Sequence, residues 1–286
     1  MSLLSRSGFV QQSHQTRSLR SLDHAFLSRL CEALYFKEIY VHNFKLAVAQ
    51  VSSIKGNIDA NIAVHLNAIE KASELGVAYI VFPELSITGY EPELALELAF
   101  SKADARLQPL IDSAIKNNIK IGVGAPLLAD GLPKIGLIVI LPSGIVETYA
   151  KMHLHSGEEK YFSEGEHHHH VFINDTKIAN AICADTNNPK HVNSCFEFGA
   201  SVYIAGVMVT EGGYDADTIA MKNYAEKYNM LVAMANHNRP TGGWRPVGKS
   251  AIWSSSGLLA KASETKTSLV VATKLNNEWS AQAIEI

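Results

Sequence analysis

Three side chains of this sequence, Glu84, Lys151 and Cys183, are of the types that carry out covalent acyl transfer. Each follows or ends a run of apolar residues that is long enough for a buried strand. A carboxylate can take the proton of a thiol, and an ammonium group can stabilise the thiolate and polarise a carbonyl group. If the three side chains meet, they predict nucleophilic attack by Cys183 on a carbonyl carbon.

Cys183 by itself supports two interpretations. It lies between a predicted strand ending at Ile182 and a helix start at Asn188-Pro189, where backbone N–H groups and the helix dipole favour a thiolate or an oxyanion. A buried cysteine is, however, commonly only a small apolar side chain of the core, and this segment alone favours that interpretation. The places of Glu84 and Lys151 along the chain favour the nucleophile.

Strands and helices that alternate along the chain would position these residues. The carboxyl ends of parallel strands lie at one edge of a sheet, so the three side chains are expected to meet there. Turns at Asp130-Gly131 and Ser143-Gly144 add antiparallel pairs, which predicts an α/β domain with mixed sheets. The predicted strands are 45–51, 78–82, 120–128, 134–141, 145–152, 171–173, 176–182, 201–207, 230–235, 249–254, 258–262 and 267–275, and the predicted helices are 57–75, 103–117, 189–198 and 215–228.

The chain resembles the nitrilase superfamily of carbon–nitrogen hydrolases over about residues 45–275. Three segments look like the signature segments of that family, in the family's order and at typical spacings: Val81–Tyr90 around Glu84, Tyr149–Leu154 around Lys151, and Ile182–Asp185 around Cys183. The resemblance implies a four-layer α-β-β-α sandwich of two mixed sheets. It also implies that Glu84 is the general base, Lys151 the cation and Cys183 the nucleophile.

The resemblance further implies a second glutamate between the lysine and cysteine segments. Glu158 matches the family position, and Glu159 is the alternative if the register slips by one residue. The oxyanion would be held by Lys151 and the backbone N–H of Ala184. Three residues beside the signature segments are expected to line the substrate pocket: Tyr90, Asp185 and Met208.

The reaction that this resemblance implies is hydrolysis of a non-peptide amide through a thioester on Cys183. A nitrile substrate with a thioimidate intermediate is the first alternative, and a partner-binding protein with vestigial activity is the second. A Cys183 thiol of low pKa should react with iodoacetamide well below pH 8, whereas an inert thiol would favour the binding protein. No glycine-rich phosphate loop is present, and no cofactor is expected.

Composition limits the remaining possibilities. The net charge is −3 and no long basic run occurs, which argues against a nucleic-acid partner. No apolar run reaches the roughly 18 residues of a membrane span. The three cysteines, Cys31, Cys183 and Cys195, do not form a disulfide framework, so a reducing, cytoplasmic location is expected. Cys195 is predicted to be a core residue.

Residues 1–43 differ in composition from the rest of the chain, because they are rich in Ser and Arg and contain no acidic residue before Asp23. A targeting peptide is one interpretation, and a loosely ordered or surface-docked extension is the favoured one. The hydrolase domain is then expected to be 44–286. The resemblance implies a homodimer that pairs through one helical face, for which helices 189–198 and 215–228 are the candidates.

A run of histidines, His167–His170, with His153 and His155 nearby, is compatible with zinc or nickel binding. No carboxylate or cysteine completes a ligand set at the usual sequence spacing. The expectation is therefore that the protein has no functional metal site.

Overall fold

The computed structural model describes residues 43–286. The predicted extension 1–43, with Cys31, lies outside the described residues except for Asn43. Within 43–286, no helix combines the length and the apolar character needed to cross a lipid bilayer.

The first sheet contains seven strands. They are β1 (Phe44–Gln50), β2 (Val77–Val81), β3 (Lys120–Leu127), β4 (Lys134–Ile140), β5 (Val146–Ala150), β12 (Ser268–Leu275) and β13 (Glu278–Glu285). Their order across the sheet is β13-β12-β1-β2-β3-β4-β5. The pairs β1–β2 and β2–β3 are parallel and the other pairs are antiparallel.

The second sheet contains six strands. They are β6 (His169–Ile173), β7 (Thr176–Ile182), β8 (Val202–Val207), β9 (Leu231–Asn236), β10 (Ala251–Ser254) and β11 (Gly257–Lys261). Their order is β11-β10-β9-β8-β7-β6, and β7, β8 and β9 are parallel. Both sheets are therefore mixed, as the sequence predicts.

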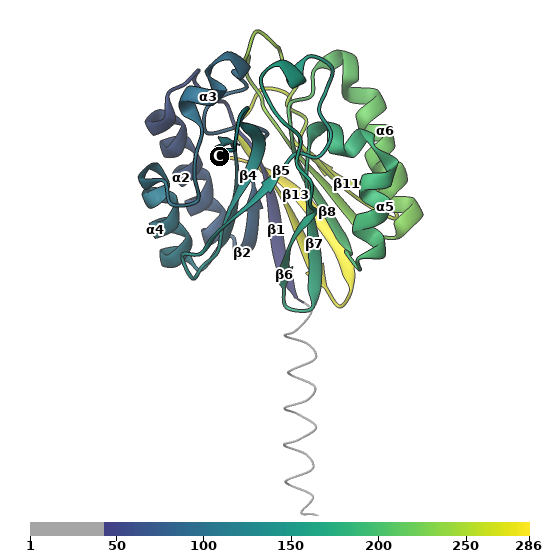
Figure 1. Ribbon diagram of the computed structural model, residues 1–286. Helices are drawn as coiled ribbons and strands as arrows, with labels where there is room; N and C mark the ends of the chain where they lie inside the picture. The colour runs from purple at the N-terminus through teal and green to yellow at the C-terminus, as the bar shows by residue number, and fades with distance from the viewer. Residues whose placement is uncertain (1–42) are drawn as a thin grey trace, which may run out of the picture. The chain divides into compact units, whose positions relative to one another are not determined.

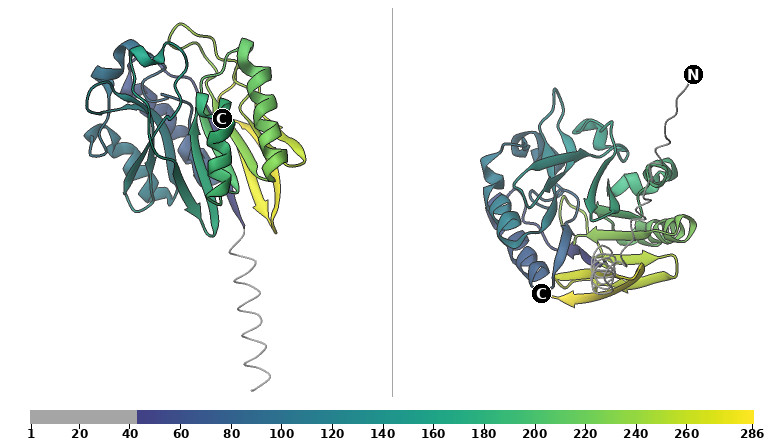
Figure 2. Two further views of the ribbon diagram at one scale, coloured as in Figure 1. Left: turned by 45° about the vertical axis from the view of Figure 1, so that its right-hand side comes forward. Right: turned by 90° about the horizontal axis from the view of Figure 1, so that it is seen from below.

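Helices cover the outer face of each sheet (Figures 1 and 2). The first sheet carries α2 (Ile58–Glu74), α3 (Ala95–Leu98) and α4 (Gln108–Asn117), and the second carries α5 (Pro189–Glu197) and α6 (Glu211–Tyr228). Short 3-10 helices occur at η1 (Pro92–Leu94), η2 (Ala105–Leu107), η3 (Glu158–Lys160) and η4 (Cys183–Asn187). The arrangement confirms the predicted four-layer α-β-β-α sandwich.

The layers follow from apolar residues on both faces of the central strands. On β1 and β2, Leu46 and Tyr79 belong to the core that includes the second sheet, whereas the next residues, Ala47 and Ile80, pack with the helices. Alternate residues of a strand point to opposite faces, so a strand that is apolar throughout must be covered on both sides.

The strand directions bring three chain segments to one edge of the sandwich. β5 is antiparallel to β4, and β4 is antiparallel to β3, so β5 runs in the same direction as β2 and β3. The carboxyl ends of β2, β5 and β7 are followed by Glu84, Lys151 and Cys183, respectively. The expected meeting of these residues is therefore compatible with the topology.

Several elements differ from the sequence prediction. Helix α3 was not expected, and α4 begins at Gln108 rather than at residue 103. β13 was not expected, because its side chains are mostly exposed and it forms a sheet edge after a turn at Asn276 and Asn277, both of which have positive φ. Helix α6 begins at Glu211 rather than at residue 215, since Gly212 and Gly213 in its first turn weaken the helical pattern of the sequence.

Candidate active site

Glu84 lies in a tight loop that follows β2 and is 1% exposed. Glycines of two neighbouring strands allow this loop to pack closely. A Cβ atom at Gly124 on β3 would overlap the backbone of Pro83, and a Cβ atom at Gly206 on β8 would lie 2.5 Å from the carbonyl oxygen of Phe82. The loop is therefore held between strands of both sheets, which fixes the position of the Glu84 carboxylate.

Lys151 is fully buried and bridges two carboxylates. Its Nζ donates hydrogen bonds to Glu84 Oε1 at 2.8 Å and to both oxygens of Glu158, at 2.9 and 2.8 Å. Glu158 also accepts from the Tyr90 hydroxyl at 2.6 Å and from the backbone N–H of His155 at 2.7 Å. The ammonium group and Glu158 are thus fixed by several charged hydrogen bonds.

Glu84 keeps one carboxylate oxygen available. Among the described residues, its Oε2 is buried without a hydrogen-bond partner, although its backbone oxygen accepts from His237 Nε2 at 2.7 Å. Cys183 is close enough to Glu84 for each group to shift the pKa of the other. Glu84 therefore has an acceptor atom ready for a proton beside the sulfur.

Burial sets the protonation of this buried group of side chains. It raises the pKa of Glu84 to about 7, with Lys151 opposing the shift and Glu158 adding to it. Burial alone would lower the pKa of Lys151, but the negative charges of Glu84 and Glu158 raise it above its usual value. Near neutral pH, Lys151 is charged and Glu84 can exchange a proton.

Cys183 is the first residue of η4, directly after β7, and has a strained backbone conformation. Its φ is +43°, a left-handed value that residues other than glycine adopt rarely. The side chain is 5% exposed, and its Sγ lies 3.6 Å from His155 Nε2 and 4.0 Å from the Met208 carbonyl oxygen. A Thr186 hydroxyl donates to the Cys183 carbonyl at 2.8 Å and holds the turn.

The resting thiol does not have the lowered pKa that backbone N–H groups and a helix dipole would favour. Burial and the neighbouring charge of Glu84 raise the pKa of Cys183 well above its usual value, and Lys151 offsets only part of this shift. η4 has only five residues, so its dipole adds little. The thiol therefore stays protonated until a neighbouring base removes its proton.

A cavity of about 510 Å³ opens at the Cys183 sulfur. Its walls include Glu84 and Glu158 on one side, and the two predicted pocket residues Tyr90 and Met208 also line it. The volume is in the range of small-molecule sites. A small substrate in this cavity would contact the sulfur and the Glu84 carboxylate together.

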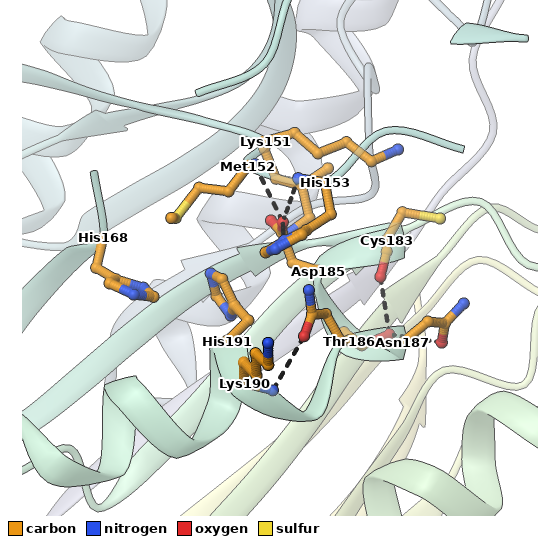
Figure 3. Close-up of polar contacts among 12 residues, drawn as sticks. Lys151, Met152, His153, His168, Cys183, Asp185, Thr186, Asn187, Lys190 and His191 are labelled. Atoms are coloured by element: carbon orange, nitrogen blue, oxygen red, sulfur yellow. Dashed lines mark hydrogen bonds and ion pairs between the residues drawn. The ribbon is translucent and has the colours of Figure 1, made fainter. Parts of the chain in front are cut away.

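Asp185, the third predicted pocket residue, does not line this cavity. It is fully buried, and Figure 3 shows its carboxylate turned toward the backbone after β5. Oδ1 accepts from the backbone N–H groups of Met152 and His153 at 3.1 and 3.0 Å, and Oδ2 accepts from the Tyr149 hydroxyl at 2.6 Å and the Ile182 N–H at 3.0 Å. Asp185 therefore links the segment of Lys151 to that of Cys183 and does not face substrate.

The other predicted positions are also placed by the structure. Glu159, the alternative to Glu158, is exposed and points its carboxylate at the Gly157 N–H. Ala184 is the second residue of η4, where helical N–H groups have no partner within the helix. Cys195 is buried on α5, as predicted. Contrary to the sequence analysis, however, the histidine run does have a cysteine nearby, because Cys195 Sγ lies 3.5 Å from His168 Nδ1.

Most of the other residues that line the cavity were not identified from the sequence as part of this site. His155 lies 3.6 Å from the sulfur, and Asp217 of α6 and Trp244 also line the cavity. The only sequence signal for His155 was its place four residues after Lys151, which the sequence analysis assigned to a possible metal set. Asp217 and Trp244 lie far along the chain from every signature segment, so no local pattern indicated them.

Comparison with known proteins identifies the family. A sequence model described as carbon-nitrogen hydrolase matches residues 45–281. An (R)-stereoselective amidase of a Pseudomonas species is 26% identical over 197 residues, which are 67% of this chain and 70% of that protein. A nitrilase of Pyrococcus abyssi is 26% identical over 236 residues, which are 80% of this chain and 88% of that protein.

Two further matches differ in what they cover. A glutamine-dependent NAD(+) synthetase of Thermotoga maritima is 26% identical over 206 residues, and the chain spans only 36% of that protein's length. A solved amidase from Nesterenkonia sp. AN1, with the acetamide moiety of fluoroacetamide added at its active-site cysteine, superposes with a TM-score of 0.76 at 21% identity, covering 82% of this chain and 92% of that one. The fold agrees, and the matched family model covers most of the chain: this protein belongs to the carbon–nitrogen hydrolase family.

Proposed function

We propose that the protein hydrolyses the C–N bond of a small non-peptide amide through a thioester on Cys183. The observation that carries this proposal is the buried Glu84–Lys151–Glu158 cluster at the wall of the cavity that exposes the Cys183 sulfur. Relatives named as an amidase and a nitrilase support the same bond type. A buried ammonium between two carboxylates is costly to maintain, which favours a functional role over a structural one.

The first half-reaction forms the thioester. Glu84 Oε2 takes the thiol proton while Cys183 Sγ attacks the carbonyl carbon. Because the pKa of Cys183 is raised, the thiol needs a base, and the raised pKa of Glu84 makes its carboxylate a better one. Lys151 and the Ala184 backbone N–H stabilise the oxyanion. The C–N bond then breaks, and Glu84 returns its proton to the leaving ammonia or amine.

The second half-reaction releases the acid. Glu84 takes a proton from a water molecule as the water oxygen attacks the thioester carbon. The C–S bond breaks, and the proton on Glu84 returns to the Cys183 sulfur, so the enzyme is restored. Glu158 acts by holding Lys151 in place, because both of its oxygens bond that ammonium. Tyr90 and Met208 are proposed to contact the substrate from the cavity wall.

Amide and nitrile substrates are separated by one assay. Ammonia release from short aliphatic amides, ω-amides, carbamoyl compounds and nitriles should be measured with Cys183→Ala as the blank. We expect turnover of at least one amide and a much slower reaction with nitriles. Turnover of nitriles alone would replace the amidase proposal with the nitrilase alternative. A folded protein that turns over none of them would favour the partner-binding alternative.

We also propose that the protein is a cytoplasmic homodimer paired through α5 and α6. Three large apolar side chains are exposed on or beside these helices: Phe196, Phe198 and Ile219. Two free thiols, Cys183 and Cys195, are compatible with a reducing compartment. Sedimentation of Phe198→Glu should show monomers if this face pairs, and an unchanged dimer would place the interface elsewhere.

A further inference from the structure

A second group of reactive side chains lies on the outer side of the second sheet. His191 and Cys195 are four residues apart on α5 and therefore share one helix face, and both are buried. His168 comes from the chain just before β6 and is partly exposed. None of the three lines the cavity at Cys183. We call His168, His191 and Cys195 the His–His–Cys cluster.

The spacing of the ligand atoms in this cluster suits a tetrahedral ion. Cys195 Sγ lies 3.5 Å from His168 Nδ1 and 4.0 Å from His191 Nδ1, and one ligand atom from each residue falls within 4.8 Å of the others. In tetrahedral zinc sites, the usual Zn–S and Zn–N bond lengths separate sulfur from nitrogen by about 3.6 Å. One pair already has this separation, and the other needs to close by a few tenths of an ångström.

Hydrogen bonds leave the lone pair of His191 on Nδ1, the ring nitrogen that lies 4.0 Å from Cys195 Sγ. The Tyr149 hydroxyl donates to Asp185 Oδ2 at 2.6 Å, so its oxygen accepts from His191 Nε2–H at 3.0 Å. The proton of the neutral ring is thus on Nε2, and Nδ1 carries the lone pair. The Tyr203 hydroxyl donates to this Nδ1 at 2.9 Å and would have to give up that acceptor to an ion.

The two imidazoles of the cluster lie side by side. Figure 3 shows the two side chains beside each other, and their ring centroids are 4.7 Å apart. Two neutral imidazoles and a thiol select a borderline transition metal over Mg²⁺ or Ca²⁺, which prefer oxygen ligands.

We propose that His168, His191 and Cys195 bind a zinc ion or a similar divalent transition metal, with a water molecule as the fourth ligand on the partly exposed His168 side. The Cys195 thiol releases its proton to solvent when the ion binds. This site is separate from the proposed hydrolysis and does not depend on it.

The expected role of the ion is to stabilise the active site indirectly, through hydrogen bonds of Tyr149 and Asp185. A metal on His191 Nδ1 makes the Nε2–H group a stronger hydrogen-bond donor to the Tyr149 oxygen. Histidine ligands in other metal sites commonly donate their second ring N–H to a neighbouring acceptor in this way. Tyr149 donates to Asp185, which in turn holds the Met152 and Ile182 backbone. The ion would therefore stiffen the two segments that carry Lys151 and Cys183 without touching the substrate.

Cobalt titration of the full chain tests the site. The parent protein carries Cys31→Ser and Cys183→Ala, so that Cys195 is the only thiol, and is freed of metal with a chelator before Co²⁺ is added. We expect one Co²⁺ per chain, with a thiolate-to-cobalt charge-transfer band and visible bands of four-coordinate cobalt. Cys195→Ser should abolish the charge-transfer band, and His168→Ala should weaken binding at least tenfold.

His167→Ala is the matched control, because His167 adjoins His168 in the chain but is exposed and outside the cluster. It should bind Co²⁺ like the parent. The proposal is overturned if the parent shows no thiolate band, if His168→Ala binds as tightly as the parent, or if His167→Ala loses as much affinity as His168→Ala. Should Cys195→Ser fail to fold by circular dichroism, the partly exposed His168 still decides the question.

Discussion

Two cysteines, Cys183 directly after β7 and Cys195 on α5, have a similar immediate neighbour and very different surroundings. Cys183 Sγ lies 3.6 Å from a histidine nitrogen of His155, and Cys195 Sγ lies 3.5 Å from one of His168. Around Cys183 are a buried ammonium and two carboxylates at a cavity, whereas Cys195 Sγ contacts the imidazoles of His168 and His191 and lies outside that cavity. The cysteine–histidine pair alone therefore does not determine the chemistry; the charges and the space around it do.

The largest effect should separate the two sulfurs in catalysis. Cys183→Ala is expected to lower kcat/KM by roughly 10⁴-fold or more, since it removes the nucleophile of the proposed reaction. Cys195→Ala should lower it by no more than about threefold, because Cys195 does not reach the cavity. Steady-state ammonia release measures both. Equal losses in the two variants would show that the surroundings of Cys183 do not make it the nucleophile.

The next effect concerns the buried charges that distinguish the Cys183 region. Lys151→Met should lower the free energy of unfolding by about 3–5 kcal/mol, because two buried carboxylates lose their shared cation. Urea unfolding followed by circular dichroism measures this change. Lys160→Met, at an exposed lysine of η3, is the control and should change stability little. A loss below about 1 kcal/mol for Lys151→Met would mean that the Lys151 ammonium does not hold the Glu84 and Glu158 carboxylates together.

Asp185 links the two regions, and its replacement should have a smaller effect. Asp185→Asn places an NH₂ group where only hydrogen-bond donors point, so we expect a loss of about 1–3 kcal/mol in unfolding free energy and a lower kcat. Asp175→Asn, in the exposed turn before β7, is the matched control. If Asp185→Asn leaves both stability and kcat unchanged, Asp185 does not connect the His–His–Cys cluster to the active site.

The smallest effect is a pH dependence that belongs to Glu84. Its pKa is raised to about 7, and the base form is needed to take the thiol proton, so kcat/KM should rise as pH increases through about 7 and then level off. Burial and Lys151 lower the pKa of His155, so His155 should not cause the rise of kcat/KM near pH 7. A profile measured on His155→Gln should keep the same midpoint. If the rise of kcat/KM disappears in His155→Gln, the ionisation belongs to the His155 imidazole and not to Glu84.

The sequence predicted the mixed sheets and the three central residues because that information is local, whereas the four layers were implied by the family resemblance. Apolar runs indicate buried strands, and Glu84, Lys151 and Cys183 stand directly beside such runs. The buried partner Glu158 was also identified, through the family resemblance. Strand β13 was missed because an exposed edge strand has no strong apolar pattern.

The rest depends on contacts between distant segments. Asp185 looked like a pocket residue from its place beside Cys183, yet the strained turn at Cys183 directs it to the backbone after β5. His168 and Cys195 are 27 residues apart, and only the packing of α5 on the second sheet brings them together. The raised pKa of Cys183 likewise results from burial and from Glu84, which local sequence does not show.

The proposed thioester is tested most directly by locating the acyl group on the enzyme before water releases it. The chain is mixed with p-nitrophenyl butyrate, quenched in acid, and analysed by intact mass and peptide mapping. We expect one butyryl group on Cys183 as a hydroxylamine-sensitive thioester, none in Cys183→Ala, and slower formation in Lys151→Met. A butyryl group on Cys195, or a folded protein whose Cys183 is never acylated, would contradict the proposed mechanism.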